Sequence, residues 1–415
     1  MPVAQSSGVL SFEEARRAVE EHASALAARE TETVDLLSSA GRVLAQPVLA
    51  DRDLPPFPRS TRDGYAVRSE DVARTPATLD VIGEIKAGES PDKIPASIPP
   101  GQAASIMTGA PVPDGADAVV MVEYTSQKGS RVEISRPVAH GENVVPRAAE
   151  ARNGAVLVEK GERLTDAAIA LAASVGASKL RVYKRPRVAV LTTGDEIVPI
   201  DASPGPTQIR NSNSYSLAVQ VRQAGGDPVL LGIAPDEAKQ LRTMIEEGLH
   251  ADLLLMTGGV SMGRYDLVEQ VLAELKAEFF FTGAKIQPGR PVVFGHCAAS
   301  DKPRTYFFGL PGNPVSTMVT FELFARPMLE ALAGMLPRKL RFVHARLKTE
   351  IRVKPGLKRF LPALLSGEFE NSQAELVPWQ GSGDIAATAR ANCYVVISPD
   401  REVFATGEFV PILLR

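Results

Sequence analysis

The sequence predicts an α/β protein of several domains with a mainly parallel sheet at its centre. Between residues 187 and 320 an apolar strand runs three times through a glycine-rich loop into a helix, and such units build parallel sheets. The chain of 415 residues is longer than one typical domain. On both sides of this segment, short β-rich runs alternate with Gly/Pro turns, which is typical of β domains.

The N-terminal segment predicts helices. Ser11 and Glu14 form a capping box in front of a helix that carries Phe12 and Val19 on its apolar face. A second helical pattern covers Val34 to Leu44, and Thr165 caps an alanine-rich helix that ends at Gly176. We therefore expect residues 1–54 and 141–185 to form one discontinuous helical and linker domain.

Changes in the residue pattern along the chain predict three further domains. Leu54–Pro58 contains three prolines and marks a crossing into an inserted β domain, residues 55–140. Residues 186–336 form the α/β domain, with helices over Tyr215–Ala224, after Asp236 as a possible cap, and from Asp266. Residues 337–415 form a C-terminal, barrel-like β domain.

Composition excludes several classes of protein. The apolar fraction is 44%, the charged fraction 23% and the net charge −3, which offers no basic field for nucleic acid. Apolar runs of four or five residues are too short to span a membrane, and no secretory signal is present. Cys297 and Cys393 are far apart in sequence and lie in apolar stretches, which favours buried thiols and a cytoplasmic protein.

The three strand–loop–helix junctions carry the main functional signal. Their loops are Thr193–Glu196, Gly258–Gly263 and Leu310–Ser316. They emerge at the carboxyl edge of the predicted sheet, where backbone N–H groups and helix N-termini bind anions, phosphates above all. Asp195, Glu196 and Asp266 lie in or just after these loops. Carboxylates beside an anion site indicate a divalent cation shared between phosphate and protein.

Other segments have weaker signals. Gln287–Pro291 is a rigid turn that carries Arg290, with Lys285 nearby, and solvated charges on a turn explain it equally well. In the inserted domain, Asp63 and Thr108 lie in segments dense in turn formers. Each residue could merely close a turn, and spacing alone leaves both interpretations open.

Gly259–Gly263 matches the Gly-x-Ser-x-Gly nucleophile elbow, with Ser261 as the nucleophile of an esterase. That interpretation requires a histidine later in the chain, and only His296 and His344 follow. The competing interpretation is a glycine loop in which Gly258 and Gly259 approach a phosphate and Ser261 donates to it. We favour the phosphate loop, because short motifs recur by chance.

Taken together, these segments resemble the molybdopterin molybdenumtransferase family, the MoeA proteins, to which the C-terminal domain of gephyrin is related. The resemblance covers the chain from about residue 10 to the C-terminus. The matching strings, in order, are Pro55–Phe57 with Ser60 and Asp63–Ala66, Thr108–Ala110 through Gly115–Asp117, Thr193–Glu196, Gly258–Gly263, Pro288–Pro291 and Leu310–Ser316.

The resemblance implies a homodimer of four-domain subunits, each with a central MogA-like α/β domain. It implies that molybdate is inserted into adenylylated molybdopterin with Mg²⁺ and release of AMP, at a site shared between subunits. Transient contacts with an adenylyltransferase and with molybdoenzymes are implied as well. Two other functions stay open: adenylyl transfer from ATP to molybdopterin, and a non-catalytic pterin-binding scaffold.

The resemblance also assigns roles. Glu196 and Asp266 are implied to hold Mg²⁺, Asp236 to order the site, and Asp63 and Thr108 to complete the molybdate side from the other subunit. The implied ligand-binding residues are Thr193, Gly194, Asp195, Gly258, Gly259, Ser261, Lys285, Gly289, Arg290, Pro311, Gly312, Asn313, Pro314 and Ser382.

The chain departs from the family pattern at three places. Arg62 stands where many relatives have Met, and where relatives often carry an arginine cluster and an Arg-Gly-Glu-Asp run, this chain keeps only Arg147 and Glu150. Gln287 replaces a cation before Pro288. We therefore predict that ligand affinity depends more on Lys285 and Arg290 than on Gln287.

Overall fold

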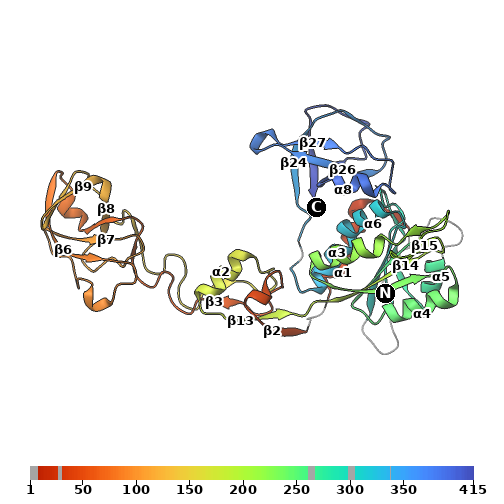
Figure 1. Ribbon diagram of the computed structural model, residues 1–415, viewed down its shortest axis with the longest axis horizontal. Helices are drawn as coiled ribbons and strands as arrows, with labels where there is room; N and C mark the ends of the chain where they lie inside the picture. Colours follow the sequence, from red (N-terminus) through yellow and green to blue (C-terminus); the bar gives the residue numbers. More distant parts are fainter. Residues whose placement is uncertain (1–7, 27–29, 260–266, 298–303, 337) are drawn as a thin grey trace.

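The computed structural model describes residues 8–26, 30–259, 267–297, 304–336 and 338–415. The molecule is elongated (Figure 1). A β domain lies at one end, a narrow waist with α2 follows, and the α/β domain and a second β domain lie together at the other end.

The central sheet has six strands in the order β17-β14-β18-β23-β22-β19. β17, β14, β18 and β23 are parallel, and β22 runs antiparallel to both of its neighbours. The predicted strands of the three junctions are thus adjacent, which confirms the parallel sheet. The strands are β14 (Arg187–Thr193), β17 (Asp227–Ala234), β18 (Leu253–Thr257), β19 (Glu278–Phe281), β22 (Val293–Cys297) and β23 (Thr305–Leu310).

Helices cover both faces of this sheet. Val188 and Val190 of β14 belong to one apolar cluster and Ala189 and Leu191 to another, because alternate strand residues point to opposite faces. The first face is covered by α1 (Phe12–Ser24), α3 (Asn213–Ala224), α6 (Pro314–Thr320) and α7 (Arg326–Leu332), the last two joined by a π-helical turn at Phe321–Ala325. The second face is covered by α4 (Ala238–Gly248) and α5 (Leu267–Glu274).

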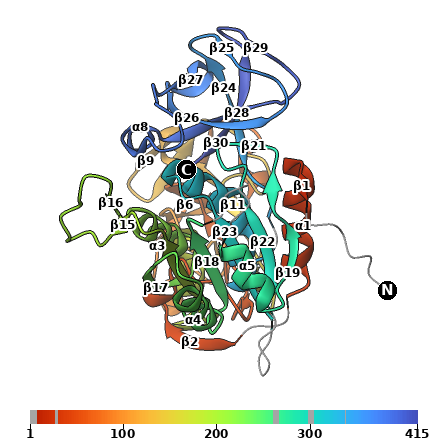
Figure 2. The ribbon, with the colours of Figure 1, turned by 90° about the vertical axis from the view of Figure 1, so that its right-hand side faces the viewer.

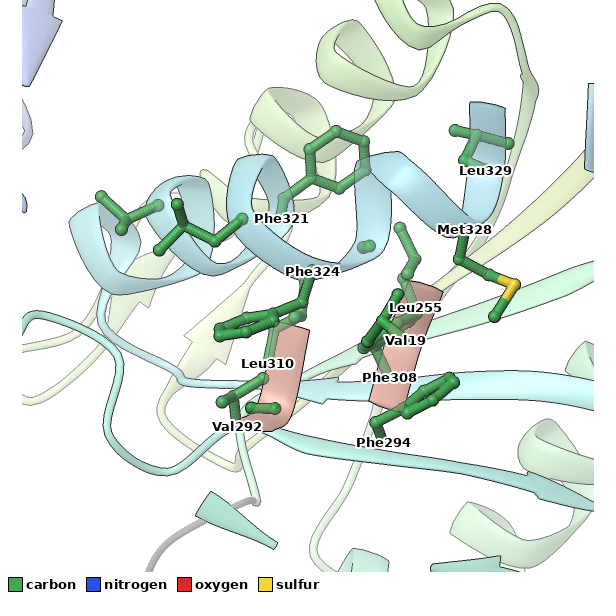
Figure 3. Close-up of a cluster of buried hydrophobic side chains, with 14 of the residues drawn as sticks. Val19, Leu255, Val292, Phe294, Phe308, Leu310, Phe321, Phe324, Met328 and Leu329 are labelled. Carbon is green, nitrogen blue, oxygen red and sulfur yellow. The ribbon is translucent and has the colours of Figure 1, made fainter. Parts of the chain in front are cut away.

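The N-terminal helix α1 packs into the core of the α/β domain. Its predicted capping box at Ser11 and Glu14 is present. Val19 is fully buried and lies next to Phe308 and Leu255 of the sheet (Figure 3). The preceding strand β1 (Val9–Leu10) pairs with β20 (Gly283–Ala284). The first part of segment 1–54 therefore contacts the α/β domain.

Strand pairs dominate the waist. They are β2 (Thr31–Asp35) with β13 (Lys179–Tyr183) and β3 (Val48–Leu49) with β12 (Val156–Val158). A further pair, β4 (Arg59–Ser60) with β11 (Val144–Val145), packs against the inserted β domain. The predicted helix over Val34–Leu44 is wrong, since this stretch contains the end of β2 and a short 3₁₀ turn. The helix capped by Thr165 is confirmed as α2 (Asp166–Ser174).

The inserted β domain is a six-stranded sheet in the order β8-β5-β7-β6-β10-β9. Its two faces bury separate apolar clusters around Val120 and Ile106, and neither cluster shares a residue with the α/β core. The strands are β5 (Gly64–Val67), β6 (Ala77–Ile85), β7 (Gln102–Ile106), β8 (Ala118–Met121), β9 (Thr125–Lys128) and β10 (Arg131–Ile134).

The C-terminal domain is a closed barrel. Its strands run in the order β26-β27-β24-β30-β28, and β28 pairs back onto β26. They are β24 (Phe342–Leu347), β26 (Lys358–Ser366), β27 (Gln373–Leu376), β28 (Cys393–Ile397) and β30 (Phe409–Leu414), beside a pair β25 (Ile351–Arg352) and β29 (Val403–Phe404) and the helix α8 (Ile385–Arg390). β21 (Ile286–Gln287) joins β26 from the α/β side and so links the two domains, which lie one above the other in Figure 2.

Both cysteines are buried, as predicted. Burial raises the pKa of Cys393 to about 11, which makes this thiol a poor nucleophile. Among the described residues, every helix is too short or too polar to cross a bilayer.

Candidate functional site

The three predicted loops meet around one cavity of about 640 Å³. The first loop ends β14, the second ends β18 and the third ends β23, so all three emerge at the same edge of the sheet. The cavity is lined by Thr192, Thr193, Gly194, Glu196, Ile197, Ile209, Arg210, Ser212, Asn213, Asp236, Thr257, Gly258, Gly259, Pro291, Pro311, Gly312, Asn313, Pro314, Gly383 and Ile385.

Glycines allow the loops to come this close. Gly258 has φ +89°, and a Cβ there would lie 2.3 Å from the carbonyl oxygen of Thr193. A Cβ on Gly312 would lie 3.5 Å from the Cα of Gly258, so the second and third loops are in near contact. Pro314 begins α6, as predicted, and sets its backbone for the first helical turn. The glycine loops and the first residue of α6, Pro314, therefore line the cavity together.

Asn213, which the sequence analysis missed, ties the loops together. Its Nδ2 donates to Thr257 Oγ1 and to the carbonyl of Gly312, both at 2.8 Å. Thr257 Oγ1 in turn donates to the carbonyl of Pro311 at 3.2 Å. The only signal in the sequence is the polar run Arg210–Ser214, which leads into the first turn of α3.

Two polar atoms at this site are buried without a hydrogen-bond partner in the part of the chain that the structure describes. They are Asn213 Oδ1 and Thr193 Oγ1, and both residues line the cavity. Buried polar groups are nearly always paired. Two such atoms at one cavity are consistent with a polar ligand there.

Three carboxylates stand at one side of the cavity. The backbone N–H of Asp236 donates to Asp195 Oδ1 at 3.0 Å, and Glu196 lines the cavity with Asp236. Partial burial raises the pKa of Asp236, and the charges of Asp195 and Glu196 add to the rise. The predicted capping role of Asp236 is wrong: α4 begins at Ala238, Glu237 is its N-cap, and no side chain caps it.

These carboxylates fit a cation that keeps other ligands. Among the described residues, no three His, Cys, Asp or Glu side chains converge to hold a metal ion by themselves. Mg²⁺ is commonly bound by one or two carboxylates together with water and substrate phosphates. Glu196 and Asp236 fit that pattern. The other predicted metal ligand, Asp266, lies outside the described residues, as does Ser261.

Neither predicted cation, Lys285 or Arg290, is among the residues that line the cavity, and Ser382 is next to one that does. Of the turn Gln287–Pro291, only Pro291 lines it. Gly289 packs against α6, where a Cβ would meet Thr320 Cγ2 at 2.3 Å. Lys285 and Arg290 are exposed. Ser382 accepts a hydrogen bond from the N–H of Val315 through its carbonyl, at 3.0 Å, next to the lining residue Gly383.

Asp63 and Thr108 lie close together but far from this cavity. The backbone N–H and the hydroxyl of Thr108 donate to Asp63 Oδ1 at 2.6 and 2.9 Å. These bonds lower the pKa of Asp63 and keep the carboxylate charged. The pair belongs to the inserted β domain, at the opposite end of the molecule from the α/β domain in Figure 1.

Comparison with known proteins covers three successive ranges that make up most of the chain. Residues 10–176 match a family model described as the MoeA N-terminal region, domains I and II; residues 189–331 match a probable molybdopterin-binding domain; residues 344–414 match the MoeA C-terminal region, domain IV. The chain belongs to the MoeA family.

Full-length relatives within the MoeA family agree with this assignment. A molybdopterin molybdenumtransferase of Nostoc sp. is 36% identical over 394 residues, which cover 93% of this chain and 89% of the relative. One of Bacillus subtilis is 33% identical, with 93% and 90% covered. A solved MoeA structure from Pyrococcus horikoshii OT3 has a TM-score of 0.77 at 28% identity, covering 98% of this chain and all of that one.

The esterase interpretation fails on geometry as well as on family membership. His296 lies in β22 and pairs with Tyr306, near the start of β23. The glycine loops follow the other end of that strand, after Leu310. His344 lies in β24 of the C-terminal barrel. Neither histidine lies at the edge of the sheet where the described start of the second loop, Gly258–Gly259, emerges.

Proposed function

We propose that this MoeA-family chain is a molybdopterin molybdenumtransferase that inserts molybdate into adenylylated molybdopterin and releases AMP. The observation that carries the proposal is the meeting of three glycine loops with Glu196 and Asp236 at one cavity. The substrate is a pyrophosphate diester next to a dithiolene, and molybdate adds further negative charge. Such a site needs aimed N–H groups together with a cation.

The reaction forms two bonds from the dithiolene sulfurs to molybdenum. One molybdate oxygen leaves as water with the two thiol protons, and water then cleaves the phosphoanhydride bond to give AMP. In this scheme the glycine loops hold the phosphates, and Asn213 and Thr193 offer polar atoms that lack partners among the described residues. Pro291, Gly383 and Ile385 close the cavity on the barrel side.

Mg²⁺ is part of the proposal. When bound, it supplies positive charge that offsets the repulsion between phosphates and carboxylates. Glu196 and Asp236 would hold it, with Asp266 as a third candidate from the sequence. Because Asp195, Glu196 and Asp236 are close together, a cation here would also relieve repulsion within the protein.

We further propose a homodimer in which the partner subunit supplies the Asp63–Thr108 pair. Within one chain this pair lies at the far end of the molecule, although Asp63 is held in a defined, charged position. Its distance from the cavity supports a site completed by a second copy. Cytoplasmic location and transient contacts with an adenylyltransferase or with molybdoenzymes remain part of the proposal.

A heterodimer tests the shared site. Coexpression of Asp63→Ala and Glu196→Gln chains with different tags allows the mixed dimer to be purified. If the site is shared, one of its two sites is intact, and about half of the wild-type activity is expected. Each homodimeric variant should be nearly inactive. An inactive mixed dimer would contradict a site built from two subunits.

The activity itself is tested by incubating the protein with adenylylated molybdopterin, Mg²⁺ and molybdate and measuring AMP. AMP release should require molybdate, and Glu196→Gln should abolish it. Asp201→Asn, a charge change away from the cavity, is the matched control. AMP release at the same rate with and without molybdate would contradict the proposal. Consumption of ATP with molybdopterin would favour adenylyl transfer, and pterin binding without either reaction would favour a scaffold.

A further inference from the structure

Arg163 joins the waist to the α/β domain. It lies in the waist between β12 and α2 and forms a β-bridge with Val43. Its Nη1 donates to the carbonyl of Gln223 at 2.9 Å, and its Nη2 donates to the carbonyl of Ala224 at 2.6 Å. These two residues end α3, a helix of the α/β domain. One side chain of the waist therefore bonds the end of a helix that belongs to another domain.

The two carbonyls are groups that α3 cannot satisfy by itself, because the last four carbonyls of a helix have no partner within it. The N–H of Gly225 donates to the carbonyl of Arg222 at 3.0 Å. The N–H of Gly226 donates to that of Val221 at 2.9 Å. Arg163 supplies donors to the other two carbonyls. A cation at a helix C-terminus is also favoured by the helix dipole, and a planar guanidinium can bond two acceptors at once.

The other contacts of this joint are few. Its apolar cluster has four buried residues, Val43, Tyr183, Ala333 and Met335. The N–H of Leu336 donates to the carbonyl of Gly161 at 3.3 Å. Arg163 also donates to Met335 Sδ at 3.4 Å, and its Nε is buried. The guanidinium is therefore inserted into the joint and bonds α3 and the segment after α7 together.

The opposite end of α3 is at the cavity. Its first residue, Asn213, lines the cavity and bonds Thr257 and the carbonyl of Gly312. The helix has 12 residues and is therefore about 18 Å long. The glycine loops and the waist are thus fixed to opposite ends of one helix. The waist carries the inserted β domain at the far end of the molecule (Figure 1), so a small rotation at the joint moves Asp63 and Thr108 a long way.

We propose that Arg163 is a positioning residue: it fixes the waist on α3 and so places the inserted domain, with Asp63 and Thr108, for the site of the partner subunit. This inference rests on the proposed function and on its shared site. Arg163 needs no contact with the substrate for this role. Reacting groups must be placed closely, and a misplacement of about 1 Å can cost about a hundredfold in rate.

Because the inserted domain serves the other subunit, loss of Arg163 should act in trans. Two mixed dimers test this, in which chains with different tags combine Arg163→Met with Glu196→Gln or with Asp63→Ala. In the first dimer, the intact site uses the inserted domain of the chain that keeps Arg163, and about half of the wild-type AMP release is expected. In the second, that site uses the inserted domain of the Arg163→Met chain, and at least about tenfold less activity than in the first is expected.

The reverse order of activities would mean that Arg163 supports the α/β domain of its own chain, and would overturn the inference. Equal activities of the two dimers would overturn it too. Arg181→Met is the matched control, because Arg181 is exposed on β13 and bonds Thr31 within the waist; both of its mixed dimers should keep about half of the activity. Arg163→Lys keeps the charge beside the carbonyls and should give a smaller difference in the same direction. It replaces Arg163→Met if that chain does not fold.

A third mixed dimer separates this inference from the proposed function. It combines Asp63→Ala with Glu196→Gln, and both of its chains keep Arg163. If it has about half of the wild-type activity while the two Arg163→Met dimers are equal, the positioning role alone is wrong. If it is inactive, the shared site is wrong and the positioning role fails with it.

Discussion

At the residue scale, the ionised carboxylate of Asp236 lowers the stability of the folded protein. Its raised pKa means that the folded protein holds this proton more tightly than the unfolded chain. The carboxylate therefore becomes increasingly unfavourable as the pH rises from the ordinary aspartate pKa through the raised one. We expect Asp236→Asn to increase the Tm slightly at pH 7 in metal-free buffer, and the gain to shrink toward about pH 4. A lower Tm at pH 7 would contradict this.

A magnesium titration tests whether the same carboxylates bind a cation. Because a cation would relieve repulsion among Asp195, Glu196 and Asp236, Mg²⁺ should raise the Tm of the wild-type protein. The increase should be smaller in Asp236→Asn and smaller still when Glu196→Gln is added. Equal shifts in all three proteins, measured by thermal unfolding over a Mg²⁺ series, would place the cation elsewhere.

Gln287 has a structural partner that its exposed position does not suggest. Its Oε1 accepts from Arg359 Nε at 2.7 Å, and Arg359 is only 7% exposed. Gln287→Ala would leave that guanidinium N–H without its acceptor, which costs about 1–2 kcal/mol. Gln287→Glu should retain the bond. Denaturant unfolding of both variants checks this, and equal stabilities would contradict it. The predicted dependence of ligand affinity on Lys285 and Arg290 stays a prediction.

At the scale of elements, the second loop depends on Gly258. An alanine there must adopt φ near +89° and place its Cβ 2.3 Å from the carbonyl of Thr193. We expect Gly258→Ala to destabilise the protein by about 2 kcal/mol or more. Gly383→Ala is the matched control, because it also changes a lining glycine but has open space around it. Similar unfolding midpoints for both variants would contradict the strain.

Local signals in the sequence were sufficient to place the starts of three helices. The capping box at Ser11, the cap at Thr165 and the proline that starts α6 depend on neighbouring residues alone. The helix predicted over Val34–Leu44 failed because β2 is stabilised by β13, more than 140 residues later. Asn213 was missed for the same reason: its partners, Thr257 and Gly312, are distant in sequence.

At the scale of the whole molecule, the elongated arrangement divides the proposed site into two halves. The glycine loops belong to the α/β domain, and Asp63 and Thr108 belong to the inserted β domain, which has its own apolar core. Sequence alone gave the residues of both halves through the family resemblance. It gave no distance between them, because that distance depends on how the waist holds the domains apart.

This division predicts that binding and transfer can be separated by mutation. Asp63→Ala should leave AMP affinity within about twofold of wild type, because the glycine loops proposed to hold the phosphates lie in the α/β domain, and should reduce molybdenum transfer by at least about a hundredfold. Glu196→Gln should weaken both. Calorimetry with AMP and the molybdate-dependent AMP assay measure the two effects on the same protein. Thr108→Val, which removes only the hydroxyl donor to Asp63 and keeps the backbone one, should give an intermediate loss of transfer. A matching fall in AMP affinity for Asp63→Ala would mean that the inserted domain contributes to nucleotide binding and that the two halves are not independent.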